Sequence, residues 1–114
     1  MIGLVAAVLL GTAHQYGAEL DCAAGYEALR AGVGRSPEEP SSLPGANPLF
    51  SLHADQTARA VYTLTKPAHP AHPAVLKIRQ IPAPPGVERS ACGYGDKAEF
   101  DRLIADWLEE PPEE

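Results

Sequence analysis

Two cysteines, Cys22 and Cys92, place the strongest constraint on how this 114-residue chain can fold. Their spacing fits neither a Cys-x-x-Cys redox motif nor a zinc site, and an even number of cysteines allows all of them to pair. In an oxidising compartment, two thiols in a small domain are normally paired. Closing a loop of about 70 residues would stabilise the fold by ~4 kcal/mol on the chain-entropy model. We therefore predict a Cys22–Cys92 disulfide. A reactive thiol is the alternative, but it needs a cytosolic setting and a nearby base, and the sequence indicates neither.

The N-terminal segment resembles the hydrophobic region of a secretory signal. Residues 2–10 form an apolar run, and the small residues 11–13 place a cleavage site after Ala13. The run is shorter than the ~20 residues that a membrane-spanning helix needs. We expect a signal segment over 1–13, a periplasmic or secreted location, and no transmembrane span in the mature chain. No Lys or Arg precedes the run, so a buried first strand is the alternative.

Two helices are predicted, one near each end of the mature chain. Asp96 with Glu99 forms a capping-box-like start for the second helix. Its apolar residues recur at i, i+3, i+4, i+7 and i+8, which predicts one buried stripe: Phe100, Leu103, Ile104, Trp107 and Leu108. The first helix is predicted over 22–32, with Asp21 as its N-terminal cap. One face of it carries the apolar residues Cys22, Tyr26, Leu29 and Val33. Trp107 is expected to anchor the core.

Strand-like segments lie between the two helices. Three of them cover 49–53, 58–65 and 74–81, and 87–91 adds a fourth, edge strand. The order predicts an α+β domain, in which an N-terminal and a C-terminal helix pack on a small antiparallel sheet of three to four strands held by one disulfide. We assign 14–110 to this single domain and 111–114 to an acidic tail.

Charge is distributed unevenly along the chain. The formal net charge is −6, which argues against nucleic-acid binding. Six acids and two bases give −4 over 1–55, one acid and five bases give +4 over 56–95, and eight acids and two bases give −6 over 96–114. Either the acidic C-terminal segment balances the basic middle within the fold, or the basic strands form an anion-binding face.

A proline–histidine segment over 66–74 is the most unusual local feature. Each proline restricts the preceding residue to extended conformations, which favours polyproline II. In that helix of three residues per turn, His69 and His72 project from one side, about 9 Å apart. We predict a stiff binding loop whose candidate residues, with those of the next strand, are Lys66, His69, His72, Lys77 and Arg79.

The same segment carries a resemblance. Residues 65–74, followed by Cys92-Gly93-Tyr94-Gly95-Asp96 and a helix with Phe and Trp, resemble a group of small exported bacterial proteins with no assigned activity. The likeness covers roughly the second half of the chain. It implies export and an α+β shape, and it transfers no catalytic residue.

The functional reading favours a non-enzymatic module. No nucleophile elbow, phosphate-binding glycine loop or zinc-protease motif occurs, and no cofactor is indicated. We expect a small exported envelope protein that binds an envelope protein or an anionic envelope component. The alternative is a copper- or zinc-binding protein, with ligands drawn from His14, His53, His69 and His72. Cleavage after Ala13 would make His14 the N-terminal residue, where its amine and imidazole together can hold copper.

Overall fold

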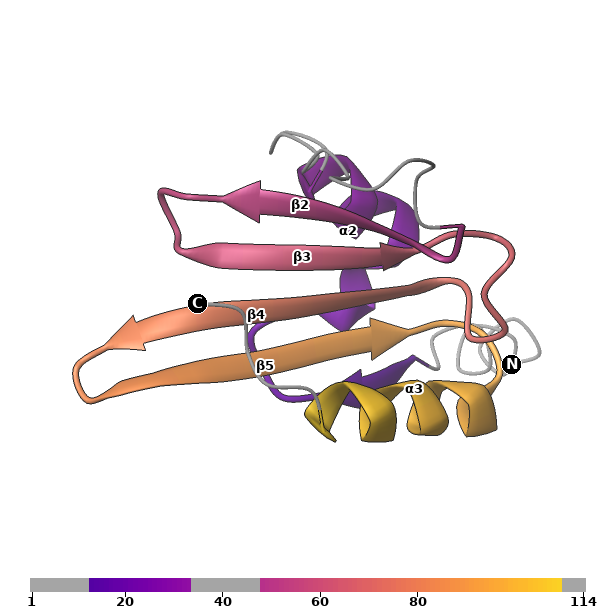
Figure 1. The fold of residues 1–114 in the computed structure, drawn as a ribbon. Helices are drawn as coiled ribbons and strands as arrows, with labels where there is room; N and C mark the ends of the chain where they lie inside the picture. Colours follow the sequence, from indigo (N-terminus) through magenta and orange to yellow (C-terminus); the bar gives the residue numbers. More distant parts are fainter. Residues whose placement is uncertain (1–12, 34–47, 110–114) are drawn as a thin grey trace, which may run out of the picture.

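The computed structural model describes residues 13–33 and 48–109. Within these residues the chain forms one antiparallel sheet of five strands (Figure 1). From edge to edge the sheet consists of β1 (His14–Tyr16), β5 (Pro85–Gly93), β4 (Ala74–Pro82), β3 (Ala60–Thr65) and β2 (Phe50–Asp55). All four pairings are antiparallel, and β2 to β5 follow one another as a meander. The α+β class is confirmed, but the sheet has five strands rather than three to four.

The additional strand is β1, which pairs with the end of β5 so that His14 lies opposite Gly93. Its three residues are too few to give the alternation that identifies a strand in a sequence. Because β1 occupies that edge, the predicted edge position of the 87–91 strand is wrong. β5 lies between β1 and β4, and it buries Ser90, Ala91 and Cys92.

The first helical segment is divided in two. A 3-10 turn, η1 (Cys22–Ala24), precedes α2 (Tyr26–Val33), and Gly25 separates them at a φ of 92°. That angle is readily available to glycine and ends a right-handed helix. The single helix predicted over 22–32 is therefore wrong, and the side chain of Asp21 makes no capping bond. The predicted apolar face is present, because Cys22 and Val33 are buried and Tyr26 and Leu29 pack beside them.

The second helix, α3 (Lys97–Glu109), confirms its prediction closely. The Glu99 N–H donates to Asp96 Oδ1 over 3.0 Å, which satisfies one of the unpaired donors of the first turn. The stripe is buried from Phe100 to Trp107, whose side chain is 7 % exposed. Leu108 is the exception at 43 % exposed.

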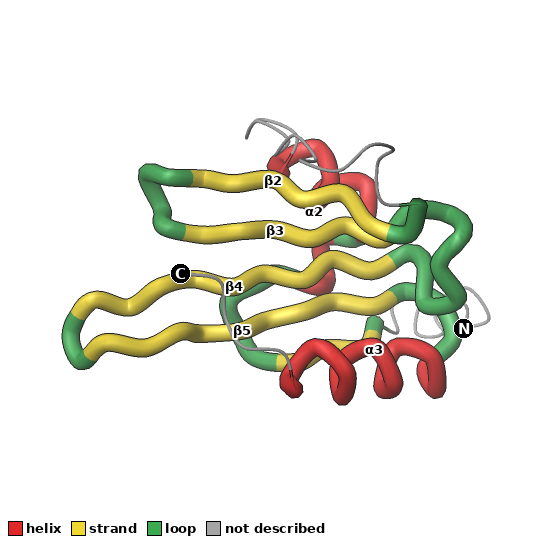
Figure 2. Tube along the Cα trace, viewed as in Figure 1, coloured by secondary structure: helices red, strands yellow, loops and turns green. Residues whose placement is uncertain are grey.

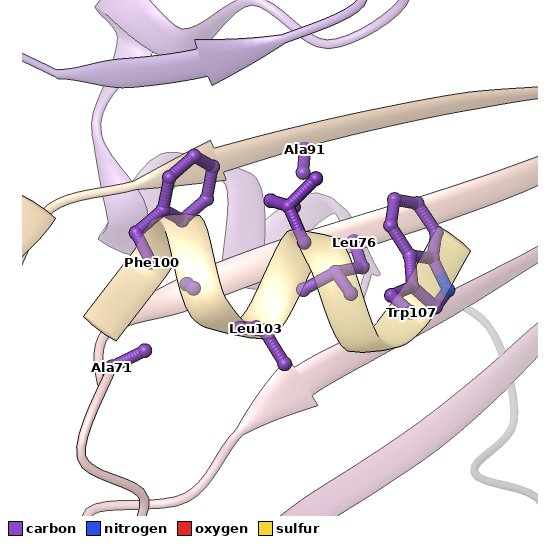
Figure 3. Packing of buried hydrophobic residues seen from close by; sticks show 8 residues of the cluster. Ala71, Leu76, Ala91, Phe100, Leu103 and Trp107 are labelled. Carbon is purple, nitrogen blue, oxygen red and sulfur yellow. The ribbon is translucent and has the colours of Figure 1, made fainter. Parts of the chain in front are cut away.

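The two helical segments cover opposite faces of the sheet, with α3 in front and α2 behind in Figure 1. Successive residues of β4 therefore enter two different cores. Leu76 packs with Ala91 and with Phe100, Leu103 and Trp107 of α3 (Figure 3). Val75 packs on the other side, with Cys92 and Leu64. This double burial explains why Ala74, Val75 and Leu76 form a continuous apolar run instead of alternating.

The Cys22–Cys92 disulfide is confirmed. It joins η1 to β5, which lies between β1 and β4, and the Cα atoms of the two residues are 5.4 Å apart. Both cysteines are buried in the core behind the sheet.

No helix among the described residues has the length and apolarity to cross a membrane. Residues 1–12 of the predicted signal segment and the predicted tail over 111–114 lie outside the described residues.

Candidate functional site

A groove lies on the front face of the sheet, beside α3. The helix runs along the side of the sheet formed by β5 and β1, and no described helix lies in front of β2 and β3 (Figures 1 and 2). The resulting hollow has a volume of about 550 Å³. Its apolar lining comes from three strands and from α3, and consists of Phe50, Leu52, Ala54, Ala60, Val61, Leu76, Ile78, Leu103 and Trp107.

The floor of the groove follows from strand register. Leu52 of β2 lies opposite Thr63 of β3, which lies opposite Leu76 of β4. One step along the strands, Ala54, Val61 and Ile78 form a second row of the same kind. Because side chains two residues apart point to the same face of a strand, both rows face α3. Leu52 remains 38 % exposed, and no described helix lies in front of its strand.

The groove has a polar end at the β2–β3 turn. Asp55, Gln56, Thr63, Arg59, Gln80 and Arg89 complete the lining, and all but Thr63 lie toward that end. Arg89 is engaged there, since its Nη1 donates to the Trp107 carbonyl over 2.7 Å and its guanidinium lies 5.1 Å from the Trp107 ring centre. Asp55 accepts the N–H of Ala58 over 3.2 Å and so stabilises the turn.

Arg59 differs from these neighbours. Its side chain is exposed, and it makes no ion pair with any of the described residues. Its φ is 55°, the left-handed region that glycine or asparagine usually occupies. A long cationic side chain therefore stands at a position where backbone geometry alone would favour another residue.

The proline–histidine segment connects β3 to β4 as a loop (Figure 2). The predicted polyproline II conformation is wrong, because the segment forms two successive turns. The His69 N–H donates to the Lys66 carbonyl over 2.9 Å, and the His72 N–H donates to the His69 carbonyl over 3.0 Å. Polyproline II has no internal hydrogen bonds, whereas here the N–H groups of His69 and His72 each close a turn.

The two histidines of this loop are half-buried and lie in different surroundings. His69 packs against Phe50, with ring centres 4.9 Å apart, and its Nδ1 accepts the Ala71 N–H over 2.9 Å. His72 packs edge-on against Tyr26 at 5.5 Å, and its Nδ1 lies 2.9 Å from Thr65 Oγ1. Phe50 belongs to the front core and Tyr26 to the core behind. Both imidazoles therefore stabilise the loop, instead of projecting together into solvent.

Burial lowers the pKa of His69. Desolvation is the largest cause, the neighbouring His72 lowers the pKa further, and the carboxylate of Glu99 opposes both. The hydrogen bond from Ala71 acts in the same direction as burial, because Nδ1 can accept it only while it carries no proton. The neutral imidazole is thus the form that suits this loop.

The basic side chains of β4 are already paired. Lys77 Nζ lies 3.2 Å from a carboxylate oxygen of Glu19, and Arg79 lies between Glu19 and Glu88. Lys77 also holds the pKa of Glu19 below its ordinary value, chiefly through their hydrogen bond. The structure therefore balances Lys77 and Arg79 internally, and the balancing acids come from 14–20 and β5. Lys66 uses its backbone N–H to bond the Leu49 carbonyl over 2.7 Å.

The four histidines do not gather. His14 Nε2 lies 3.1 Å from the Gly95 carbonyl, and His53 Nε2 lies 3.4 Å from Ser51 Oγ. Within residues 13–33 and 48–109, no three His, Cys, Asp or Glu side chains form a group that could hold a metal ion. The residues proposed as metal ligands thus lie apart, and so do His69 and His72, which were expected to share one side of a helix.

Sequence reasoning missed the groove. The alternating Phe50, Leu52 and Ala54 were visible as a short strand, but nothing in a strand pattern tells whether a helix covers it. In the sequence, Arg59 stands out only as one of the five bases of residues 56–95. The available signal was the number of helices: one helix of about 10 Å diameter covers roughly two strands at ~4.8 Å spacing, so it cannot cover one face of five. Comparisons of the chain with protein-family models, with curated proteins and with solved structures gave no match.

Proposed function

We propose that this chain is a small exported, non-enzymatic binding module that takes an apolar ligand in the groove between α3 and the β2–β3 hairpin. The apolar groove, in which no described helix covers β2 and β3, is the observation that carries the proposal. Its volume of about 550 Å³ lies within the range of roughly 300–1,000 Å³ that is usual for ligand pockets. Apolar side chains with a few polar groups at one end are also the usual lining of such pockets.

The proposed location outside the cytoplasm rests on two supports. The apolar run over 2–10 with small residues at 11–13 fits a signal segment. The Cys22–Cys92 disulfide is of the kind that persists in oxidising compartments and is rare in the cytosol. The resemblance to small exported proteins points the same way. An apolar ligand fits an envelope location, where amphiphiles are abundant.

Trp107 provides a direct test of binding. It is the only tryptophan of the chain and it lines the groove, so its fluorescence should change when a ligand enters. We expect the neutral probe N-phenyl-1-naphthylamine to bind the purified protein saturably. Leu52→Glu places a carboxylate on the groove floor and should weaken this binding at least about tenfold, because burying a charge against an apolar ligand is costly.

Leu108→Glu is the matched control, since Leu108 is similarly exposed but lies outside the groove lining. It should bind the probe as the wild type does. Circular dichroism and thermal melting must show that both variants fold. Leu52→Thr, which introduces a polar but β-branched side chain suited to a strand, provides a second groove variant if Leu52→Glu unfolds. Equal binding by the two Glu variants, or no saturable binding to the wild type, contradicts the proposed function.

A further inference from the structure

We propose that the ligand of the groove is a single-chain amphiphile with an anionic headgroup, bound with its head at Arg59 and its tail directed toward Phe50. This inference rests on the proposed function and adds to it the charge and the orientation of the ligand. It is carried by the polarity of the groove along the strands, by the guanidinium of Arg59, which forms no ion pair with a described residue, and by the dimensions of the apolar part.

The groove is polar at one end only. Asp55, Gln56 and Arg59 belong to the end of β2 and the β2–β3 turn, and Gln80 and Arg89 adjoin them on β4 and β5. The other end is formed by Phe50 and Leu52 with Leu76 and Leu103. Such a division matches a ligand that is itself polar at one end and apolar along the rest. A uniformly apolar ligand would leave the polar end unused.

The charge of the polar end favours an anion. Two arginines and one carboxylate line the groove, and the carboxylate of Asp55 accepts a backbone N–H of the turn. Arg89 is held by the Trp107 carbonyl and ring, so it contributes positive potential without being the main contact. Arg59 has no acidic partner among the described residues, and its guanidinium can donate two hydrogen bonds to a carboxylate.

The backbone of Arg59 strengthens this assignment. A non-glycine residue at a φ of 55° is uncommon, because its Cβ crowds the backbone there, and strained residues of this kind cluster at active sites and ligand clamps. Glycine at this position would relieve the strain and would still donate and accept the same backbone bonds. The arginine side chain is therefore the part that the fold itself does not require.

The dimensions suit a single chain. From Phe50 to Asp55 the strand advances by roughly 17 Å, at ~3.3 Å per residue. A groove of that length and about 550 Å³ accommodates a medium-length acyl chain. A folded protein partner would need about 800 Å² of surface on this side, whereas the groove is one hollow of about 550 Å³ with an apolar lining from α3 and three strands.

The experiment compares three amphiphiles with the same twelve-carbon chain, all below their micellar concentrations. Dodecanoate is anionic, dodecyltrimethylammonium is cationic, and dodecyl maltoside is neutral. Binding is followed by Trp107 fluorescence and confirmed by calorimetry. We expect dodecanoate to bind at least about tenfold more tightly than the cationic compound, and Arg59→Gln to weaken dodecanoate by about fivefold to tenfold while leaving the neutral compound unchanged.

Two further variants separate binding from folding. Arg59→Gly should be no less stable than the wild type, because glycine suits the left-handed backbone, yet it should lose the preference for dodecanoate. Arg30→Gln removes an exposed arginine from α2, on the opposite face of the sheet, and should change nothing. Arg59→Lys should restore part of the preference, because it retains the charge but not the paired donors.

The outcomes distinguish this inference from the proposed function. If all three amphiphiles bind equally and Arg59→Gln has no effect, the anionic headgroup is disproved but the apolar groove stands. If none of them binds, and the neutral naphthylamine does not bind either, both proposals fail. If sedimentation shows a dimer that Leu52→Glu dissociates, the groove is a contact between two copies of the chain and the amphiphile inference is overturned.

Discussion

At the scale of single residues, the proline–histidine loop depends on side chains that accept and donate hydrogen bonds within it. Thr65 Oγ1 accepts the Ala74 N–H over 2.8 Å and lies beside His72, while His69 accepts the Ala71 N–H. Each bond satisfies a backbone donor at a point where the prolines prevent a regular ladder. His69 therefore acts here as a structural acceptor, and its protonation state becomes part of the stability of the fold.

The pH dependence of stability should reveal this role. The folded-state pKa of His69 is below its ordinary value of 6.5, so the unfolded chain binds the proton more readily. Its contribution is therefore complete above that value and is lost as the pH falls through 6.5 toward the folded-state pKa. His69→Gln should show a smaller fall in urea midpoint between about pH 7.5 and pH 5.5 than the wild type. Carboxylates titrate in both proteins, so their effect cancels in the comparison. Parallel pH profiles would disprove the role.

At the scale of elements, α3 was predictable because its signals are local. Asp96, Glu99 and the stripe beginning at Phe100 lie within a few turns, and each acts through neighbours three or four residues away. The break at Gly25 was not predictable, because a glycine inside an apolar helical pattern is often tolerated. Strand β1 was missed because its signal is not local. It has no apolar pattern of its own, and it becomes a strand only by pairing with residues almost 80 positions later in the chain.

Close contact between β5 and α3 gives a prediction about two glycines. A Cβ atom on Gly93 would overlap the ring of Phe100, whereas a Cβ on Gly32 in α2 would meet nothing within 4 Å. Gly93→Ala should therefore destabilise the protein by about 1–3 kcal/mol through overpacking. Gly32→Ala should stabilise it by up to about 1 kcal/mol, because alanine favours a helix. Chemical denaturation of both variants measures the difference. Similar effects of the two changes would show that α3 adjusts easily against β5.

At the scale of the whole molecule, the sequence predicted the composition of the fold better than its arrangement. The disulfide, the α+β class and the C-terminal helix followed from cysteine count, element order and periodicity. The groove did not, because it results from one helix covering only part of a face, which depends on strand order. The candidate loop was found, but His69 and His72 were placed wrongly, since turn hydrogen bonds prevailed over the extended preference of residues before proline.

The Cys22–Cys92 disulfide should contribute strongly to the free energy of unfolding. Replacing both Cys22 and Cys92 by alanine should lower the free energy of unfolding by about 2–5 kcal/mol, because the unfolded chain is no longer closed into a long loop. Reduction of the wild type should lower the melting temperature in the same direction. The groove should remain intact at low temperature, since neither cysteine lines it. A variant that melts as the wild type does would contradict this expectation.

The order of the strands also determines the order in which the chain can be completed. β2, β3, β4 and β5 pair with their neighbours in sequence, so these hairpins can form as synthesis proceeds. β1 cannot pair until residues 91–93 have been synthesised, roughly 75 residues after β1 itself. Cys22 waits in the same way for Cys92. Although β1 is the most N-terminal strand that the structure describes, it is therefore the last to join, and until residues 91–93 have been made the outer edge of β5 has no partner.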